Sequence, residues 1–290
     1  MAEYYYLLAG LPDLKLESTD AAVSTRELHE MIDDQKEDVG RDMHLLELFF
    51  LKGDCKNLLI LLEDNLAELP YGSNWAKKDL QEMIADALED EFQDDTRFPS
   101  FMAPFVREYF ERKGEAGYFP EDALMLRYWN YLKSKGTGFV GRWAALNLDI
   151  ANTLTALICE RQGWPVEQYT YGYDAADVDD DLFARLKEID AETDPVQKER
   201  RIDALKWVWI EDETFIEPFN VDALYAYLLK AEMLERWAIL DPEQGRERFT
   251  QIIEGLRKEA TVPAEFTVYM PQTEEAFDMR SEGRYNKNEK

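Results

Sequence analysis

Four carboxylates near the middle of the chain have the spacing of calcium ligands. Asp177, Asp179, Asp181 and Glu188 occupy positions 1, 3, 5 and 12 of the loop with which EF-hand proteins bind calcium. Position 6 is Leu182, where that loop requires a glycine for its sharp turn. We therefore expect the carboxylates to begin a helix, where their charge complements the positive end of the helix dipole. A metal-dependent hydrolase that uses Asp177 to Asp181 is the enzyme alternative.

The histidines, cysteines and glycine-rich turn do not form a recognisable catalytic motif. His29 and His44 both lie in amphipathic segments without a cysteine or carboxylate at ligand spacing, which favours structural or surface roles. Cys55 and Cys159 lie in apolar helical runs and read as buried, reduced thiols of a cytosolic protein. The segment 133–138 lacks the spacing of a phosphate-binding loop and follows no strand. We expect no catalytic residue, no metal and no cofactor.

Two short segments resemble one another at an offset of 95 residues, and each carries an aspartate and an asparagine three positions apart. The pairs are Asp54 with Asn57 and Asp149 with Asn152, and the spacing places both members of a pair on one helical face. If these side chains are buried, they must form hydrogen bonds to neighbouring helices or loops. A repeated unit indicates an extended architecture that serves binding. The alternative is that Asp54 caps a helix and the similarity is coincidental.

Charge and composition narrow the classes of partner. The 290 residues include 61 acidic and 33 basic side chains, which gives a formal charge of −28. Such a charge repels nucleic acids and anionic lipids and favours partners with basic surfaces. The beginning of the chain lacks the basic region of a signal peptide, and no run of about 18 apolar residues predicts a membrane span. We expect a cytoplasmic protein that meets the membrane only indirectly, through a complex.

Helix signals dominate the remainder of the sequence. Ser24 to Glu27 form a capping box, Gly53 is expected to interrupt a helical run, and Asp54 is placed to cap the next helix. The strand candidates are Tyr4 to Leu8 and Gln168 to Tyr173. The expected helices cover residues 25–36, 43–50, 56–66, 75–91, 101–112, 121–135, 140–161, 182–189, 195–209, 221–240 and 242–258. The predicted class is all-α, with an extended or disordered tail over residues 263–290.

Three stretches carry a resemblance to known families. The opening Tyr4 to Leu14, and Leu58 to Leu62 after Asp54 and Asn57, resemble an uncharacterised Bacteroidetes family that is encoded among V-type ATPase subunits. The helical pattern also resembles the C subunit of the V/A-type ATPase, called d in eukaryotes, in which an Asn-Leu segment recurs in each lobe. Tyr227 to Leu240 is similar to that family's closing segment, although Trp237 stands where the pattern has asparagine.

The resemblance implies a funnel of two to three similar helical lobes, here expected over residues 1–115, 116–192 and 193–262. It also implies a non-catalytic rotor subunit that links the central stalk of a V-type ATPase to the membrane proteolipid ring, and so to transport of protons or another ion. The partners of the protein would be other ATPase subunits. The protein itself would lie in the cytoplasm, peripheral to the inner membrane through the complex. A generic acidic helical adaptor unrelated to the ATPase is the alternative.

Overall fold

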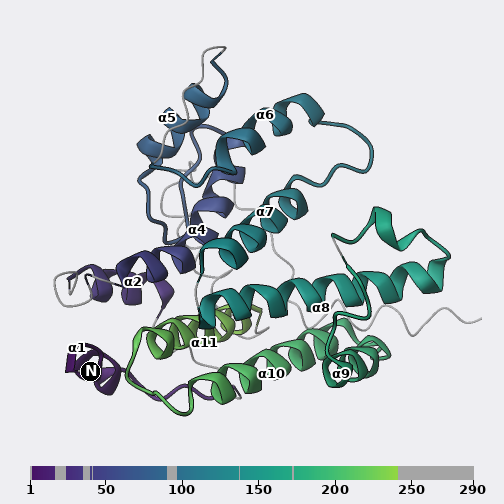
Figure 1. The fold of residues 1–290 in the computed structure, drawn as a ribbon. Coiled ribbons are helices and arrows are strands. Elements are labelled where there is room, and N and C mark those ends of the chain that lie inside the picture. Colours follow the sequence, from purple (N-terminus) through teal and green to yellow (C-terminus); the bar gives the residue numbers. More distant parts are fainter. Residues whose placement is uncertain are drawn as a thin grey trace, which may run out of the picture. The chain divides into compact units, whose positions relative to one another are not determined.

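The fold was obtained as a computed structural model that describes residues 2–16, 24–34, 40, 42–89, 97–136, 138–171 and 173–240 (Figure 1). The chain divides into two compact units, Met1–Ala238 and Ile239–Lys290. The expected helix 242–258 and the expected tail 263–290 both lie outside the described residues. The described helices lie in the first unit, except that the last two residues of the helix Val221–Leu240 fall in the second.

The described residues form helices and no strand, which confirms the predicted all-α class. The elements are α1 Ala2–Gly10, α2 Thr25–Asp34, α4 Met43–Glu63, α5 Lys77–Ala87, α6 Met102–Arg112, α7 Pro120–Lys135, α8 Phe139–Gln162, the 3₁₀ turn η1 Val166–Gln168, α9 Asp180–Asp190, α10 Pro195–Thr214 and α11 Val221–Leu240. None of these helices is long and apolar enough to cross a membrane.

Both strand predictions were wrong. Tyr4 to Leu8 lie in α1, where Tyr4 and Leu7 are buried and Tyr5 and Tyr6 are exposed. Burial of two side chains three positions apart is the period of a helix, because a strand would bury alternate residues. The second candidate begins with the end of the 3₁₀ turn η1 and continues into a bend.

The predicted interruption at Gly53 was also wrong, since α4 runs through it without a break. A Cβ atom on Gly53 would lie 1.9 Å from the carbonyl oxygen of Gly72. The glycine therefore lets the loop after α4 pass directly against the helix. Asp54 lies inside α4 and is fully buried, so it does not cap a helix.

Within the described residues of the first unit, α7 and α8 make the most extensive helix contact, and aromatic side chains join α8 to α4 and α11. Helix α7 packs against both α4 and α8, while α9 packs against α8 and α10 (Figure 1). Tyr225 of α11 is fully buried between Phe49 of α4 and Phe139 of α8, with both rings meeting it edge-on. Helices far apart in the sequence thus share one core, which holds α4 and α11 together.

The two helices that carry the asparagines are similar in length, with 21 residues in α4 and 24 in α8, and the helices α7 and α11 begin alike. The residues 122–124 of α7 and 222–224 of α11 both read Asp-Ala-Leu. Leu28, Leu124 and Leu224, near the start of α2, α7 and α11, are all fully buried. The lobes 1–115, 116–192 and 193–262 stay a prediction, as does their funnel arrangement.

Candidate functional site

The side chain of Asn57 fastens the loop after α4 to the helix. Its Nδ2 donates a hydrogen bond to the carbonyl oxygen of Tyr71 at 3.0 Å, and its Oδ1 accepts one from the Tyr71 backbone N–H at 3.4 Å. Asn57 is completely buried. The amide therefore uses one of its two N–H donors and its carbonyl acceptor on a single residue of the loop.

Asn152 of α8 makes the same pair of hydrogen bonds in the second segment. Its Nδ2 donates to the carbonyl oxygen of Tyr171, and its Oδ1 accepts from the Tyr171 N–H, both at 3.1 Å. Each asparagine thus clamps the backbone of a tyrosine in the loop that follows its helix. We call these contacts the first clamp (Asn57 and Tyr71) and the second clamp (Asn152 and Tyr171).

The aspartates of the two segments have different surroundings. Asp54 accepts hydrogen bonds from the Asn74 N–H at 3.1 Å, the Asn74 Nδ2 at 2.7 Å and the Trp75 N–H at 3.2 Å. Burial raises the pKa of Asp54 to about 7, although these three donors act to lower it. Asp149 is only partly buried, and burial raises its pKa against the nearby charge of Lys133. Both clamps therefore contain the hydrogen bonds of the asparagine. The hydrogen bonds from the loop to a buried aspartate are described for the first clamp, at Asp54.

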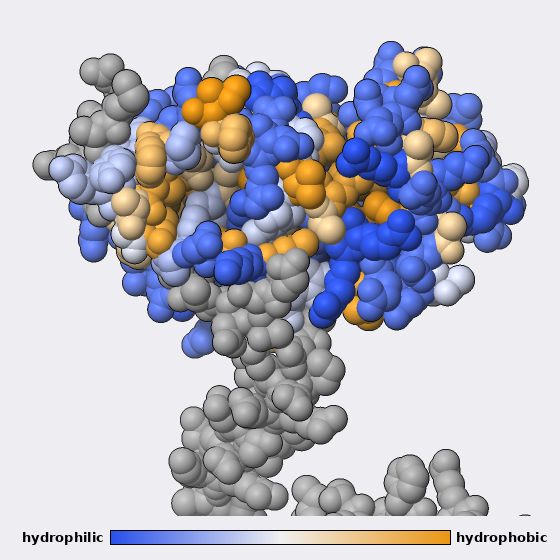
Figure 2. Space-filling view, turned by 90° about the horizontal axis from the view of Figure 1, so that it is seen from below, coloured by the Kyte–Doolittle hydropathy of each residue, from blue (hydrophilic) through white to orange (hydrophobic). Residues whose placement is uncertain are grey.

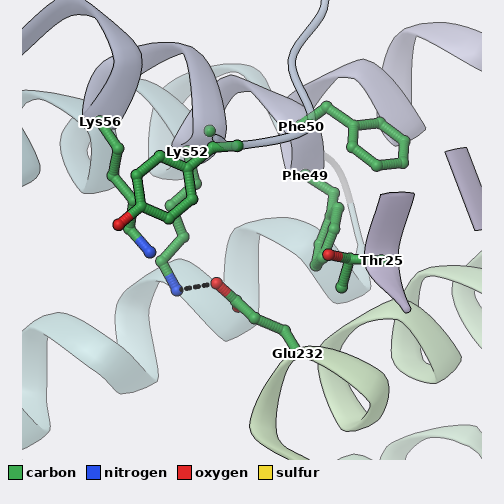
Figure 3. A pocket seen from close by; sticks show the side chains of 9 residues that line it. Thr25, Phe49, Phe50, Lys52, Lys56 and Glu232 are labelled. Atoms are coloured by element: carbon green, nitrogen blue, oxygen red, sulfur yellow. Dashed lines mark hydrogen bonds and ion pairs between the residues drawn. The ribbon is translucent and has the colours of Figure 1, made fainter. Parts of the chain in front are cut away.

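Tyr71 of the first clamp is one of the residues that line a small pocket (Figure 3). The ring of Tyr71 lies beside Lys56, with 4.7 Å from the ammonium nitrogen to the ring centre. The cavity measures about 50 Å³ and is lined by Thr25, Phe49, Phe50, Lys52, Gly53, Lys56, Tyr71, Gly72 and Glu232. Residues of α2, α4, the clamped loop and α11 thus meet at this pocket.

A lysine–glutamate pair spans the pocket, and sequence reasoning missed it. Lys52 of α4 donates to Glu232 of α11 at 2.7 Å, as the dashed line in Figure 3 marks. Burial acts to raise the pKa of Glu232, but Lys52, Lys56 and Arg236 outweigh it and leave that pKa below its ordinary value. Lys52 and Lys56 lie one turn apart in an otherwise largely apolar helix. Two cations at this spacing were the only indication of the site in the sequence. Their partner lies 180 residues from Lys52, and no sequence pattern links the two.

A larger hollow is lined in part by the next residues of the same loop, Asn74 and Trp75. It measures about 450 Å³ and is lined by His44, Glu47, Leu48, Leu51, Asn74, Trp75, Arg97, Phe98, Pro99, Tyr131 and Lys135. Trp75 and Phe98 pack against one another there, with ring centres 5.0 Å apart. Because Asn74 and Trp75 are held by Asp54, the buried carboxylate positions part of this wall.

The acidic segment whose spacing resembles a calcium-binding loop, Asp177 to Glu188, contains the beginning of helix α9. Asp179 caps α9, since its side chain accepts from the N–H groups of Asp181 at 3.1 Å and Leu182 at 3.0 Å. Asp181 pairs with Arg185 at 2.8 Å along the same helix. Within the described part of the chain, no group of three or more histidine, cysteine or acidic residues is arranged to hold a metal ion. The segment therefore has the geometry expected of a helix start.

The remaining candidates lie apart from one another. The ring of His29 packs against Phe50 at 4.1 Å between centres, and His44 lines the larger hollow. Cys55 and Cys159 are buried free thiols, in agreement with the sequence prediction. The structure does not gather the histidines and cysteines into one site.

No curated protein and no solved structure matches this chain. One family model, described as a protein of unknown function (DUF2764), matches residues 1–260. Since this match covers most of the 290 residues, the chain belongs to the DUF2764 family.

Proposed function

We propose that this protein is a non-catalytic coupling subunit of a V-type ATPase, which links the central stalk to the membrane proteolipid ring. The observation that carries the proposal is the repeated clamp, in which Asn57 and Asn152 hold equivalent loops on equivalent helices. The C subunit of these enzymes, which the sequence resembles, is likewise built of repeated helical lobes with a recurring asparagine segment. In this proposal ATP hydrolysis occurs in other subunits.

The stiffness that the two clamps give to their loops supports the same function. A coupling subunit must transmit torque between two partners, which requires rigid helices rather than a nucleophile or a metal. The clamps provide such rigidity, because each fixes a loop to a helix through two hydrogen bonds. The acidic charge of −28 favours association with basic surfaces on the stalk or ring loops.

The first test of this function is physical association. A chromosomal affinity tag on the protein should recover the catalytic, stalk and ring subunits of the V-type ATPase in stoichiometric amounts from solubilised membranes. A tagged cytoplasmic protein of similar acidity controls for adhesion to basic subunits. Recovery of the protein without ATPase subunits would support the adaptor alternative instead.

The second test separates coupling from catalysis. Inverted membrane vesicles from a deletion strain should show a loss of ATP-driven ion transport, while the catalytic subunits retain ATP hydrolysis. Wild-type protein supplied from a plasmid should restore transport. A deletion strain with an intact and fully coupled ATPase would end the proposal.

A further inference from the structure

The pocket beside the first clamp contains more positive than negative charge, in a chain where acidic side chains outnumber basic ones. Lys52 and Lys56 both line it, and Glu232 is the sole acidic residue among the described residues of the lining. Figure 3 shows the two ammonium groups extending from α4 toward the same space, with Glu232 below Lys52. Arg236 of α11 adds a positive field that acts on both Lys56 and Glu232.

Lys56 is the group that this arrangement leaves without a counterion. Glu232 pairs with Lys52, and among the described residues no carboxylate lies within ion-pair distance of Lys56. Burial lowers the pKa of Lys56, and repulsion from Lys52 lowers it further, against the weaker opposing fields of Glu232 and Glu121. A partly buried cation that faces a second cation is costly for the folded state unless an anion joins them.

The second clamp shows that the fold itself does not require the two lysines. At the offset of 95 residues, Asn147 corresponds to Lys52 and Ala151 to Lys56. Asn147 bonds to the carbonyl oxygen of Trp143 in its own helix, and Ala151 is exposed. The second clamp nevertheless holds Tyr171 with the same two hydrogen bonds. The hydrogen bonds of a clamp therefore form without lysines at these two positions, and the first clamp carries Lys52 and Lys56 beyond that need.

We propose that this pocket binds the carboxylate of an aspartate or glutamate side chain from a protein partner, between Lys56 and the free donors of Lys52. An ammonium group has three N–H donors, so Lys52 can serve Glu232 and the incoming carboxylate together. The rings of Phe49 and Tyr71 line the same space and contact the methylene groups of the entering side chain. This site is independent of the proposed ATPase function, since any protein partner with such a carboxylate can use it.

Size and donor type favour a carboxylate over a phosphate. About 10–15 Å³ of cavity volume admits one water molecule, so a cavity of about 50 Å³ admits a small anionic group and excludes a nucleotide. Phosphate sites usually add backbone N–H donors at the beginning of a helix. Here Lys52 and Lys56 lie in the interior of α4, whose N–H groups serve the helix. Glu232 also repels a dianion more strongly than a monoanion.

The partner's carboxylate should stand among basic residues, because the whole chain is strongly acidic. The test therefore uses the full-length protein, with its lysines labelled biosynthetically with ¹³C and ¹⁵N so that the ammonium groups stay intact, and two peptides. One is acetyl-Lys-Lys-Glu-Lys-Lys-amide and the other carries glutamine in place of glutamate. The glutamate peptide should shift the NMR signal of Lys56 saturably, with at least fivefold tighter binding than the glutamine peptide. Equal binding of the two peptides would overturn the proposal.

Two variants and inorganic phosphate complete the experiment. Lys56→Met removes the charge with a linear side chain one atom shorter and should abolish the preference for the glutamate peptide, read from the Lys52 signal. Lys78→Met is the matched control, because Lys78 is exposed on α5 and pairs only with Glu82 at 3.4 Å among the residues described. Lys56→Met should unfold at the same temperature as Lys78→Met or higher. A clearly lower unfolding temperature for Lys56→Met would assign Lys56 a structural role and overturn the proposal. The proposal would also be overturned if inorganic phosphate saturated the Lys56 signal of the wild-type protein at a lower concentration than the glutamate peptide does.

Discussion

At the scale of single residues, Asn57 and Asn152 are the groups on which the two loops depend. Each is buried and each satisfies one residue of its loop with a donor and an acceptor. The spacing of the asparagines was readable in the sequence. The tyrosines they hold were not, because the loops differ in length and Tyr71 and Tyr171 lie 14 and 19 residues after their asparagines.

Replacement of either asparagine by alanine should destabilise the protein by about 2 kcal/mol, since two hydrogen bonds are lost and a buried space is left. Urea unfolding followed by circular dichroism measures this change. The two effects should add in the double variant, because the clamps share no partner. Asn130→Ala, which removes an exposed bond within α7, is the control and should change stability by less than about 0.5 kcal/mol. Similar losses for Asn57→Ala and Asn130→Ala would contradict the role of the clamp.

The buried Asp54 carboxyl predicts a dependence of stability on pH. Its pKa is raised from 3.8 to about 7 by burial, so between these values the folded state holds a proton that the unfolded state has released. The contribution of Asp54 to stability therefore falls as pH rises from about 4 to about 7 and is constant above that range. Between pH 5 and pH 7 the fall should be about 2 kcal/mol.

The comparison with Asp54→Asn isolates this effect, because the amide keeps the shape of the carboxyl and does not titrate. The free energy of unfolding should be measured for both proteins in urea at pH 5, 6, 7 and 8. As the pH rises from 5 to 7, the free energy of unfolding of the wild type should fall relative to that of the variant. A constant difference would mean that the donors from Asn74 and Trp75 keep Asp54 ionised throughout this range.

At the scale of elements, local signals predicted most helices. The capping box formed as expected, with the Glu27 side chain accepting from the Ser24 N–H at 2.9 Å and the Ser24 hydroxyl accepting from the Glu27 N–H at 3.2 Å. The predicted helix over residues 221–240 matches α11. Gly53 was misread because its local effect on helix propensity was considered without the loop that lies against it. Steric requirements set by a residue 19 positions away have no local signature.

Gly53→Ala should separate the loop from α4, although alanine favours a helix by up to about 1 kcal/mol. The new Cβ would lie 1.9 Å from the Gly72 carbonyl oxygen, which is a backbone atom that must move. We expect a net loss of about 2 kcal/mol or more and faster hydrogen exchange at the Tyr71 amide. Gly10→Ala is the control, because nothing lies within 4 Å of its Cβ position. A stable Gly53→Ala protein with an unchanged Tyr71 amide would show that the loop is not pressed against the helix.

At the scale of the whole molecule, the dominant feature is the net charge of −28. In Figure 2 hydrophilic residues cover most of the visible face of the described chain, with hydrophobic patches between them. Many of the ion pairs in the described residues are largely exposed, such as Lys78 with Glu82 and Arg185 with Asp181. Exposed pairs contribute little to stability, with a median below about 1 kcal/mol. We therefore expect repulsion among the excess carboxylates to outweigh the attraction that these pairs supply.

Salt should consequently stabilise this protein. The Debye length shortens from about 30 Å at 0.01 M to about 10 Å at 0.1 M ionic strength, which screens repulsion between distant carboxylates more than contacts between paired groups. The unfolding temperature should rise between about 10 and 200 mM sodium chloride, and a rise of roughly 2–4 °C corresponds to about 1 kcal/mol at this chain length. Choline chloride at equal ionic strength should give the same rise, because screening does not depend on the identity of the cation. An unfolding temperature that falls with salt would show instead that ion pairs such as Lys52 with Glu232 dominate the electrostatic free energy of the fold.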